Sequence, residues 1–169
     1  MRTDPRTWYG FTPPQVSTLG EGVSAFRAYD RYYQVVCRWL ADKDSVYLVP
    51  CAGTKPIHTS PMHRSIYQKY ARAFGGGREV LVVSEPAVLI RYADLERLEP
   101  VFMYDFPPHL LVGESRDLMV RRLAKALGEK DVRGCLPRHH ADLVSSAVGS
   151  FENDWSGGLY EMAWKAARL

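Results

Sequence analysis

Apolar residues gather into four short runs, at residues 46–49, 79–84, 101–105 and 132–136. Each run is rich in Val, Leu, Tyr or Phe, as is typical of strands buried in a parallel sheet. Segments with helical spacing of apolar residues separate or follow the runs. This alternation predicts an α/β layered domain with a mostly parallel sheet. We expect one domain over residues 1–169, with residues 1–22 as an irregular lead segment.

Six segments carry the helical pattern. The first spans Ser24 to Asp42, with Ser24 as the expected N-cap and Cys37 on the core-facing side. The second is opened by Ser60 as cap and Pro61 at the first helical position. The clearest helix is expected over residues 115–127, with Gly128 as its stop. The remaining segments are residues 92–98, 140–148 and 159–169.

Polar residues stand just past all four predicted strands. Because the carboxyl ends of parallel strands lie at one edge of a sheet, we expect these residues to gather there, where open α/β folds bind ligands. The four sets are Cys51 and Lys55; Ser84 and Glu85; Tyr104 and Asp105; and Arg138, His139 and His140.

Composition narrows the class of protein without deciding its function. Hydrophobic residues make up 46% and charged residues 24% of the chain, which is ordinary for a globular protein. No apolar run approaches the ~20 residues of a membrane span, and the first residues have no signal core, so we expect a cytoplasmic protein. Three cysteines without a CxxC spacing predict neither a disulfide framework nor a zinc site. We therefore expect no cofactor and no metal. The net charge of +3 permits contact with nucleic acid but does not require it.

The densest chemistry lies in residues 50–63, between a predicted strand and a predicted helix. Cys51 follows the strand end, with a cation four residues on and a helix start nearby, and both features favour a thiolate nucleophile. The other interpretation of Cys51 is a small buried apolar residue. Lys55 is expected to stabilise an anion or orient a carbonyl, although most lysines are simply exposed. His63, in the first helical turn, is expected to be neutral and able to accept a proton near pH 7, or to be an ordinary half-exposed helix histidine.

The other strand ends supply candidates for substrate binding. Ser84 can form a hydrogen bond where its strand stops, and Asp105 is placed to hold the amine and ring N–H of a purine-like base or to cap the chain that follows. His139 and His140 equally fit the start of a helix. Gly75, Gly76 and Gly77 precede a strand and indicate a helix stop rather than a nucleotide loop.

These residues resemble the signature of the archaeosine synthase family over roughly residues 40–140. The segment Pro50-Cys51, Lys55-Pro56, Ser60 and His63 matches the family's spacing of PC, KP, Ser and His. Downstream, residues 80–86, 89–91, 100 and 104–107 are similar to the family's second half. Two residues depart from the pattern: Ile57 stands where the family has tyrosine, and Glu85 separates Ser84 from Pro86.

The resemblance implies a three-layer α/β sandwich similar to uracil-DNA glycosylase and chemistry on the nitrile of 7-cyano-7-deazaguanine in a nucleic acid. Cys51, Lys55 and His63 are then catalytic. The substrate is bound by Ser60, Ser84, Glu85, Tyr104 and Asp105, and the nucleic acid by Arg91, Arg138 and His139.

We expect hydration of the nitrile in DNA, because the chain shows no appended RNA-binding domain such as archaeosine synthases carry. The alternatives are the addition of an amine such as lysine to the same base in tRNA, and a non-catalytic module that binds modified bases. A transglycosylase is an expected partner, and no membrane is.

Overall fold

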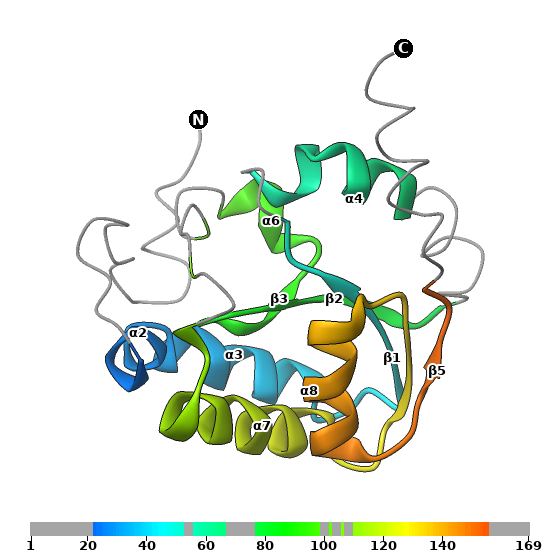
Figure 1. The fold of residues 1–169 in the computed structure, drawn as a ribbon. Helices are drawn as coiled ribbons and strands as arrows, with labels where there is room; N and C mark the ends of the chain where they lie inside the picture. Colours follow the sequence, from blue (N-terminus) through cyan, green and yellow to red (C-terminus); the bar gives the residue numbers. More distant parts are fainter. Residues whose placement is uncertain are drawn as a thin grey trace.

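The computed structural model describes residues 22–52, 56–66, 77–98, 102, 106 and 110–155. Its centre is a five-stranded sheet in the order β3-β2-β1-β4-β5 (Figure 1). The strands are β1 (Ser45–Pro50), β2 (Glu79–Ser84), β3 (Val88–Arg91), β4 (Asp131–Gly134) and β5 (Glu152–Asn153).

The sheet is mostly parallel, as predicted. β1 pairs in parallel with both β2 and β4, and β4 pairs in parallel with β5. The exception is β3, which turns back on β2 and runs antiparallel to it. The register places Pro50 opposite Val83 and Leu48 opposite Gly134, so that β1, β2 and β4 end at the same edge of the sheet.

Helices lie on both sides of this sheet. Figure 1 shows α3, α7 and α8 below it, and α4 and α6 above it. The helical elements are α2 (Val23–Arg27), α3 (Asp30–Leu40), the 3-10 helix η2 (Ile57–Thr59), α4 (Pro61–Ile66), α6 (Asp94–Arg97), α7 (Gly113–Leu127) and α8 (Arg138–Val148). Among the described residues, none of these helices is long and apolar enough to cross a membrane.

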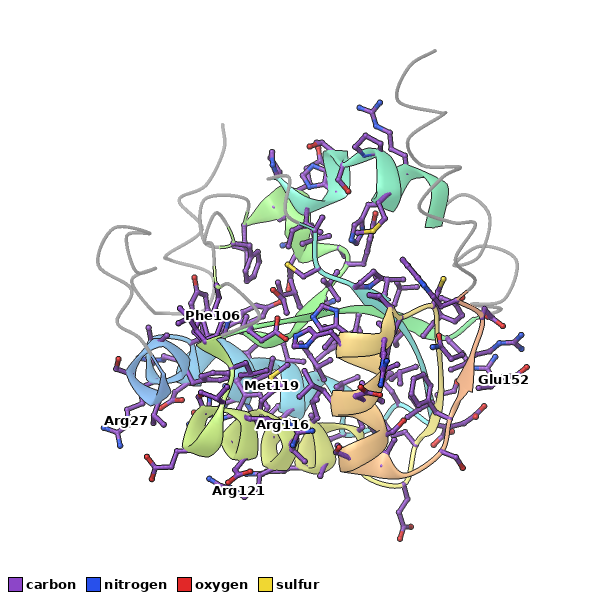
Figure 2. All side chains as sticks on the ribbon, viewed as in Figure 1. Arg27, Phe106, Arg116, Met119, Arg121 and Glu152 are labelled. Carbon is purple, nitrogen blue, oxygen red and sulfur yellow. The ribbon has the colours of Figure 1, made fainter. Side chains whose placement is uncertain are left out.

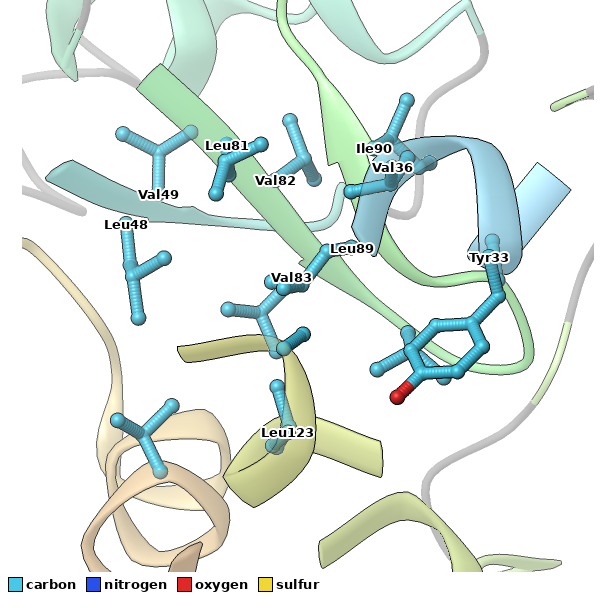
Figure 3. Packing of buried hydrophobic residues seen from close by; sticks show 14 of the residues in the cluster. Tyr33, Val36, Leu48, Val49, Leu81, Val82, Val83, Leu89, Ile90 and Leu123 are labelled. Carbon is cyan, nitrogen blue, oxygen red and sulfur yellow. The ribbon is translucent and has the colours of Figure 1, made fainter. Parts of the chain in front are cut away.

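Strands β1 and β2 are buried because they carry apolar side chains on both faces. In β1 the five residues from Val46 to Pro50 are all buried, and in β2 the last four are. Figure 3 shows Leu48 and Val83 on the side of the sheet where Leu123 of α7 lies, and all three belong to one buried core. Burying one side chain of this size stabilises the fold by about 1.5–3 kcal/mol relative to leaving it in water.

Helix α7 covers the predicted segment 115–127 and begins two residues earlier, at Gly113. Met119, Leu123 and Leu127 are buried. In Figure 2, Met119 lies between the helix and the sheet, whereas Arg121 is on the outer side and is exposed. The helix ends at Gly128, whose φ of 51° is a conformation that glycine adopts without steric cost.

The predicted helix over Ser24 to Asp42 is wrong in two respects. The segment forms two helices, α2 and α3, with a turn at residues 28–29. Ser24 is not the N-cap, because α2 begins at Val23 and Gly22 precedes it with a φ of 61°. The core-facing set is correct, since Phe26, Tyr29 and Val36 are buried and Cys37 packs against the core.

Two strands were not predicted, β3 and β5, and one predicted strand is not testable. Of residues 101–105 only Phe102 is described; it is buried and lies in a 3-10 turn. The predicted lead segment 1–22, apart from its last residue, and the predicted helix 159–169 lie outside the described residues.

Candidate functional site

The polar residues that follow β1, β2 and β4 do gather at one edge of the sheet. β1 and β2 are parallel and in register, and the backbone N–H of Cys51 donates to the carbonyl of Val83 at 3.0 Å, which continues their pairing by one residue. Cys51 therefore stands level with the end of β2. The third predicted set, Tyr104 and Asp105, lies outside the described residues, as does Lys55 of the first set.

A serine hydroxyl contacts the sulfur of Cys51. Ser84 Oγ donates a hydrogen bond to Sγ at 3.2 Å, and Sγ lies 3.7 Å from the carbonyl oxygen of Ala52. Ser84 is fully buried, whereas Cys51 is only partly buried and carries no disulfide. The thiol thus has a fixed polar neighbour on the inner side and some access to solvent. The sequence predicted that Cys51 and Ser84 lie near each other at the edge of the sheet, but it did not predict a hydrogen bond between them.

His63 contacts the backbone at the end of β1. The predicted cap is confirmed, because the backbone N–H of His63 donates to Ser60 Oγ at 3.1 Å. The imidazole is 0% exposed, and its Nε2 donates to the carbonyl of Pro50 at 2.5 Å. Its ring stacks on Tyr92 with centroids 6.0 Å apart. His63 therefore fixes the backbone just before Cys51, and its proposed part in proton transfer stays a prediction.

Ser60 serves the same short helix. The residue is buried, and its hydroxyl oxygen accepts the hydrogen bond that caps α4. The predicted contact between Ser60 and a substrate is not among the interactions of the described residues and stays a prediction.

Glu85 brings the second and fourth polar sets together. One carboxylate oxygen accepts from His139 Nε2 at 2.9 Å and the other from His140 Nε2 at 3.2 Å. The side chains of Glu85 and His140 are 5% and 7% exposed, and that of His139 is 37% exposed. The two histidines come from the first turn of α8, which starts at Arg138. We call Glu85, His139 and His140 the Glu-His-His cluster.

The electrostatics of this cluster follow from its burial and its hydrogen bonds. Burial raises the pKa of the Glu85 carboxyl, but the neighbouring His140 and the hydrogen bonds from both histidines outweigh burial, and they hold this pKa well below its usual range. The hydrogen bond to Glu85 raises the pKa of His139, and partial burial opposes that shift. Glu85 is thus a carboxylate at neutral pH.

Sequence reasoning missed this cluster. It predicted Glu85 as a substrate contact, His139 as a nucleic-acid contact and no metal ligands. The structure shows that Glu85, His139 and His140 each offer a ligand atom, and that these atoms lie within 4.8 Å of one another. A signal was present: a carboxylate just past one strand, and two adjacent histidines just past another strand of the same parallel sheet. What the sequence lacked was the order of the strands.

The two arginines predicted to contact nucleic acid are placed differently. Arg91 pairs with Leu81, three residues before Ser84 in β2, and is thus displaced by about 10 Å along the strand. Its guanidinium lies 4.1 Å from the centre of the Trp39 ring. Arg138 is 95% exposed, next to the cluster, and 3.8 Å from Asp142. Arg138 is thus beside the site, and Arg91 is not.

Comparisons with known proteins add little to this geometry. No protein-family model matches the chain, and no curated protein does. The chain is similar to the crystal structure of AF0587, a protein of unknown function, with 15% sequence identity and a TM-score of 0.49. The match covers 81% of this chain and 48% of that chain, so this chain spans about half of AF0587.

Proposed function

We propose that this protein hydrates the nitrile of 7-cyano-7-deazaguanine in DNA to the 7-amido form through a covalent intermediate on Cys51. The sequence support is the cysteine motif of residues 50–63 and its resemblance to archaeosine synthase. The structural observation that carries the proposal is the hydrogen bond from Ser84 Oγ to Cys51 Sγ at the carboxyl edge of the sheet. A partly exposed thiol held by a buried hydroxyl suits a nucleophile better than it suits a residue of the core.

The chemistry runs in two additions. The Cys51 thiolate adds to the nitrile carbon, and the nitrogen takes up a proton, which gives a thioimidate. Water then adds to the same carbon, the carbon–sulfur bond breaks, and the thiolate leaves the amide behind. The sum is one nitrile and one water consumed and one amide formed. Lys55 and His63 are the proposed proton donors to the nitrogen.

The base is held in this proposal by groups at the same edge. Ser84 is close to the sulfur and therefore to any atom bonded to it. Tyr104 and Asp105 are proposed to bind the deazaguanine ring. Both carboxylate oxygens of Glu85 accept hydrogen bonds from histidines, so a substrate contact by Glu85 requires the substrate to share one of them.

A fold similar to uracil-DNA glycosylase belongs to the same proposal. It is supported by the mostly parallel sheet, by the helices on both of its sides and by a site at the carboxyl edge. If the target base lies in a duplex, the enzyme must take it out of the stack before the sulfur can reach the nitrile. A transglycosylase that installs the base is the proposed partner.

The test is incubation with DNA and with tRNA that carry 7-cyano-7-deazaguanine, each with and without free lysine. A mass gain of one water on the DNA base supports hydration. Addition of lysine in tRNA supports the alternative, an enzyme similar to archaeosine synthase. No change in either polymer contradicts both.

Two variants separate catalysis from binding. Cys51→Ser is expected to abolish turnover and to trap no thioimidate. Cys37→Ser, a matched control on α3, is expected to keep wild-type turnover. If wild-type protein binds the modified polymer but never alters it, and Cys51→Ser binds equally well, the protein is a binding module. Full activity in Cys51→Ser contradicts the covalent route.

A further inference from the structure

We propose that Glu85, His139 and His140 form a binding site for a divalent first-row transition-metal ion. The site lies at the carboxyl edge of the sheet, between the end of β2 and the first turn of α8. The inference is drawn from the geometry of the Glu-His-His cluster and does not require the nitrile chemistry proposed above.

The donor set is one that such ions prefer. Two imidazole nitrogens and one carboxylate bind zinc, iron and related ions, and leave further coordination positions open for water or substrate. Magnesium and calcium prefer oxygen donors, and the cluster supplies nitrogen from two of its three residues. The set therefore selects a transition metal rather than an alkaline-earth ion.

The distances fit a shared ion. Ligand atoms about 2.1 Å from a metal are about 3.0 Å apart at the cis positions of an octahedron and about 3.4 Å apart in a tetrahedron. The two oxygens of Glu85 lie 2.9 Å and 3.2 Å from the Nε2 atoms of His139 and His140. All three donor atoms of the cluster are within 4.8 Å of one another. Small side-chain rotations would therefore suffice to place an ion between them.

Two of the three ligand side chains are buried, and the third is accessible to solvent. Glu85 follows β2 directly and is 5% exposed, and His140 is 7% exposed. His139 is 37% exposed, so an ion can reach the cluster from solvent on that side. The centres of the two histidine rings are 5.0 Å apart, and each ring holds one oxygen of the same carboxylate.

Affinity is expected to be moderate. A histidine that binds metal through Nε2 carries its proton on Nδ1, and in good sites that N–H has an acceptor. Nδ1 of His140 is buried without a hydrogen-bond partner in the part of the chain that the structure describes. Loss of such a partner typically weakens metal binding about 10–100-fold.

Titration of the untagged, full-length protein with Co²⁺ tests the proposal. The wild type is expected to bind one equivalent and to develop ligand-field absorption bands of a site with nitrogen and oxygen donors. Zn²⁺ is expected to displace the cobalt and to raise the melting temperature. No bands and no Zn²⁺-dependent shift would show that the cluster is only a hydrogen-bonded group of side chains, and would overturn the proposal.

Variants assign the ion to its ligands. Glu85→Gln and His139→Gln are each expected to weaken Co²⁺ binding by more than about 100-fold, because each removes a ligand rather than its outer partner. His139 is half-exposed, so His139→Gln still decides the matter if Glu85→Gln fails to fold. His58→Gln is the matched control and is expected to bind as the wild type does.

The Co²⁺ titration also tests whether Cys51 is a ligand of the ion. Cys51→Ser is expected to keep the cobalt bands, and a thiolate charge-transfer band that disappears in this variant would move the ion to Cys51 and overturn the assignment. Unchanged Co²⁺ binding in His139→Gln would also overturn the assignment of the ion to the Glu-His-His cluster. Metal binding without nitrile hydration, or hydration without metal binding, would separate the two proposals from each other.

Discussion

Among the glycines that the structure describes, Gly134 is the one at which an added methyl group would meet neighbouring atoms within 4 Å. It lies in β4 opposite Leu48 of β1. A Cβ added to Gly134 would stand 2.8 Å from the backbone oxygen of Leu48 and 3.2 Å from its Cβ. That same oxygen accepts the hydrogen bond from the backbone N–H of Cys135 at 2.8 Å. The methyl group of Gly134→Ala therefore collides with backbone, which cannot rotate away as a side chain can.

These contacts determine how much unfolding free energy Gly134→Ala loses. To reach an ordinary carbon–oxygen separation, β1 and β4 must move apart by roughly 0.4 Å or more. Such overpacking costs about 1–3 kcal/mol. Stretching the hydrogen bond from Cys135 adds part of the ~1 kcal/mol that it contributes. Alanine recovers about 0.4–1 kcal/mol by restricting the unfolded chain. The expected net loss of unfolding free energy for Gly134→Ala is about 2 kcal/mol.

Urea denaturation and thermal melting measure this loss. For a chain of this size, 2 kcal/mol lowers the melting temperature by about 4–8 °C, and the urea midpoint by about 1 M if the slope is about 2 kcal/mol/M. Glu129→Ala, in the exposed turn before β4, is the control and should stay within about 0.5 kcal/mol of wild type. A Gly134→Ala protein as stable as wild type would refute the steric argument.

Three further predictions concern the edge of the sheet. Ser84→Ala should lower nitrile-hydrating turnover by about 10–100-fold, because the sulfur loses the group that positions it, whereas Ser146→Ala should leave turnover unchanged. Burial raises the pKa of the Cys135 thiol to about 12, so iodoacetamide at pH 8 should label Cys51 at least about 10-fold faster, as mass spectrometry of the native protein would show. In the metal-free protein the lowered pKa of Glu85 adds stability that is present above the unfolded value of 4.5 and lost as pH falls below it. Below pH 4.5 the melting temperature of Glu85→Gln should therefore fall less steeply with pH than that of the wild type. Equal dependence of the two melting temperatures on pH would contradict this.

The fold was predictable where the pattern of residues is strong. Apolar runs identified β1 and β2, because strands in the middle of a sheet bury both faces. The run at residues 132–136 located β4, although Arg133 interrupts it and Asp131 is exposed. β5 could not be found this way, since Glu152 and Asn153 are exposed polar residues. Two hydrogen bonds to Leu136, which follows β4, hold β5 in place. Asn153 Oδ1 accepts from the backbone N–H of Leu136, and Asn153 Nδ2 donates to its carbonyl, each at 2.9 Å.

The break between α2 and α3 was hidden for a related reason. Phe26, Tyr29 and Val36 keep helical spacing through the turn, so the apolar face continues while the backbone does not. Arg122 of α7 donates to the carbonyl of Phe26 and pairs with Asp30 at the start of α3. Packing against a third helix thus decides where one helix ends and the next begins, and no local pattern records it.

The candidate site divides in the same way. The nearness of Cys51 to Ser84 follows from two parallel strands that end together, which the sequence alone indicates. The contact of Glu85 with His139 and His140 depends on α8 starting at Arg138, two residues earlier than expected, so that both imidazoles fall in its first turn. Sequence patterns do not fix the first residue of a helix, and here the first residues of α8 carry the chemistry.

Ser84 and Glu85 are neighbours in the chain, and this adjacency has a consequence for how the protein can be altered. The Cα atoms of Ser84 and Glu85 are about 3.8 Å apart. Ser84 carries the hydroxyl that donates to Cys51 Sγ, and Glu85 carries the carboxylate that accepts from the two histidines. A larger side chain at residue 85 is therefore expected to displace Ser84 and to disturb its hydrogen bond to Cys51 Sγ. The geometry at the thiol and the geometry of the Glu-His-His cluster are expected to respond together to such a substitution.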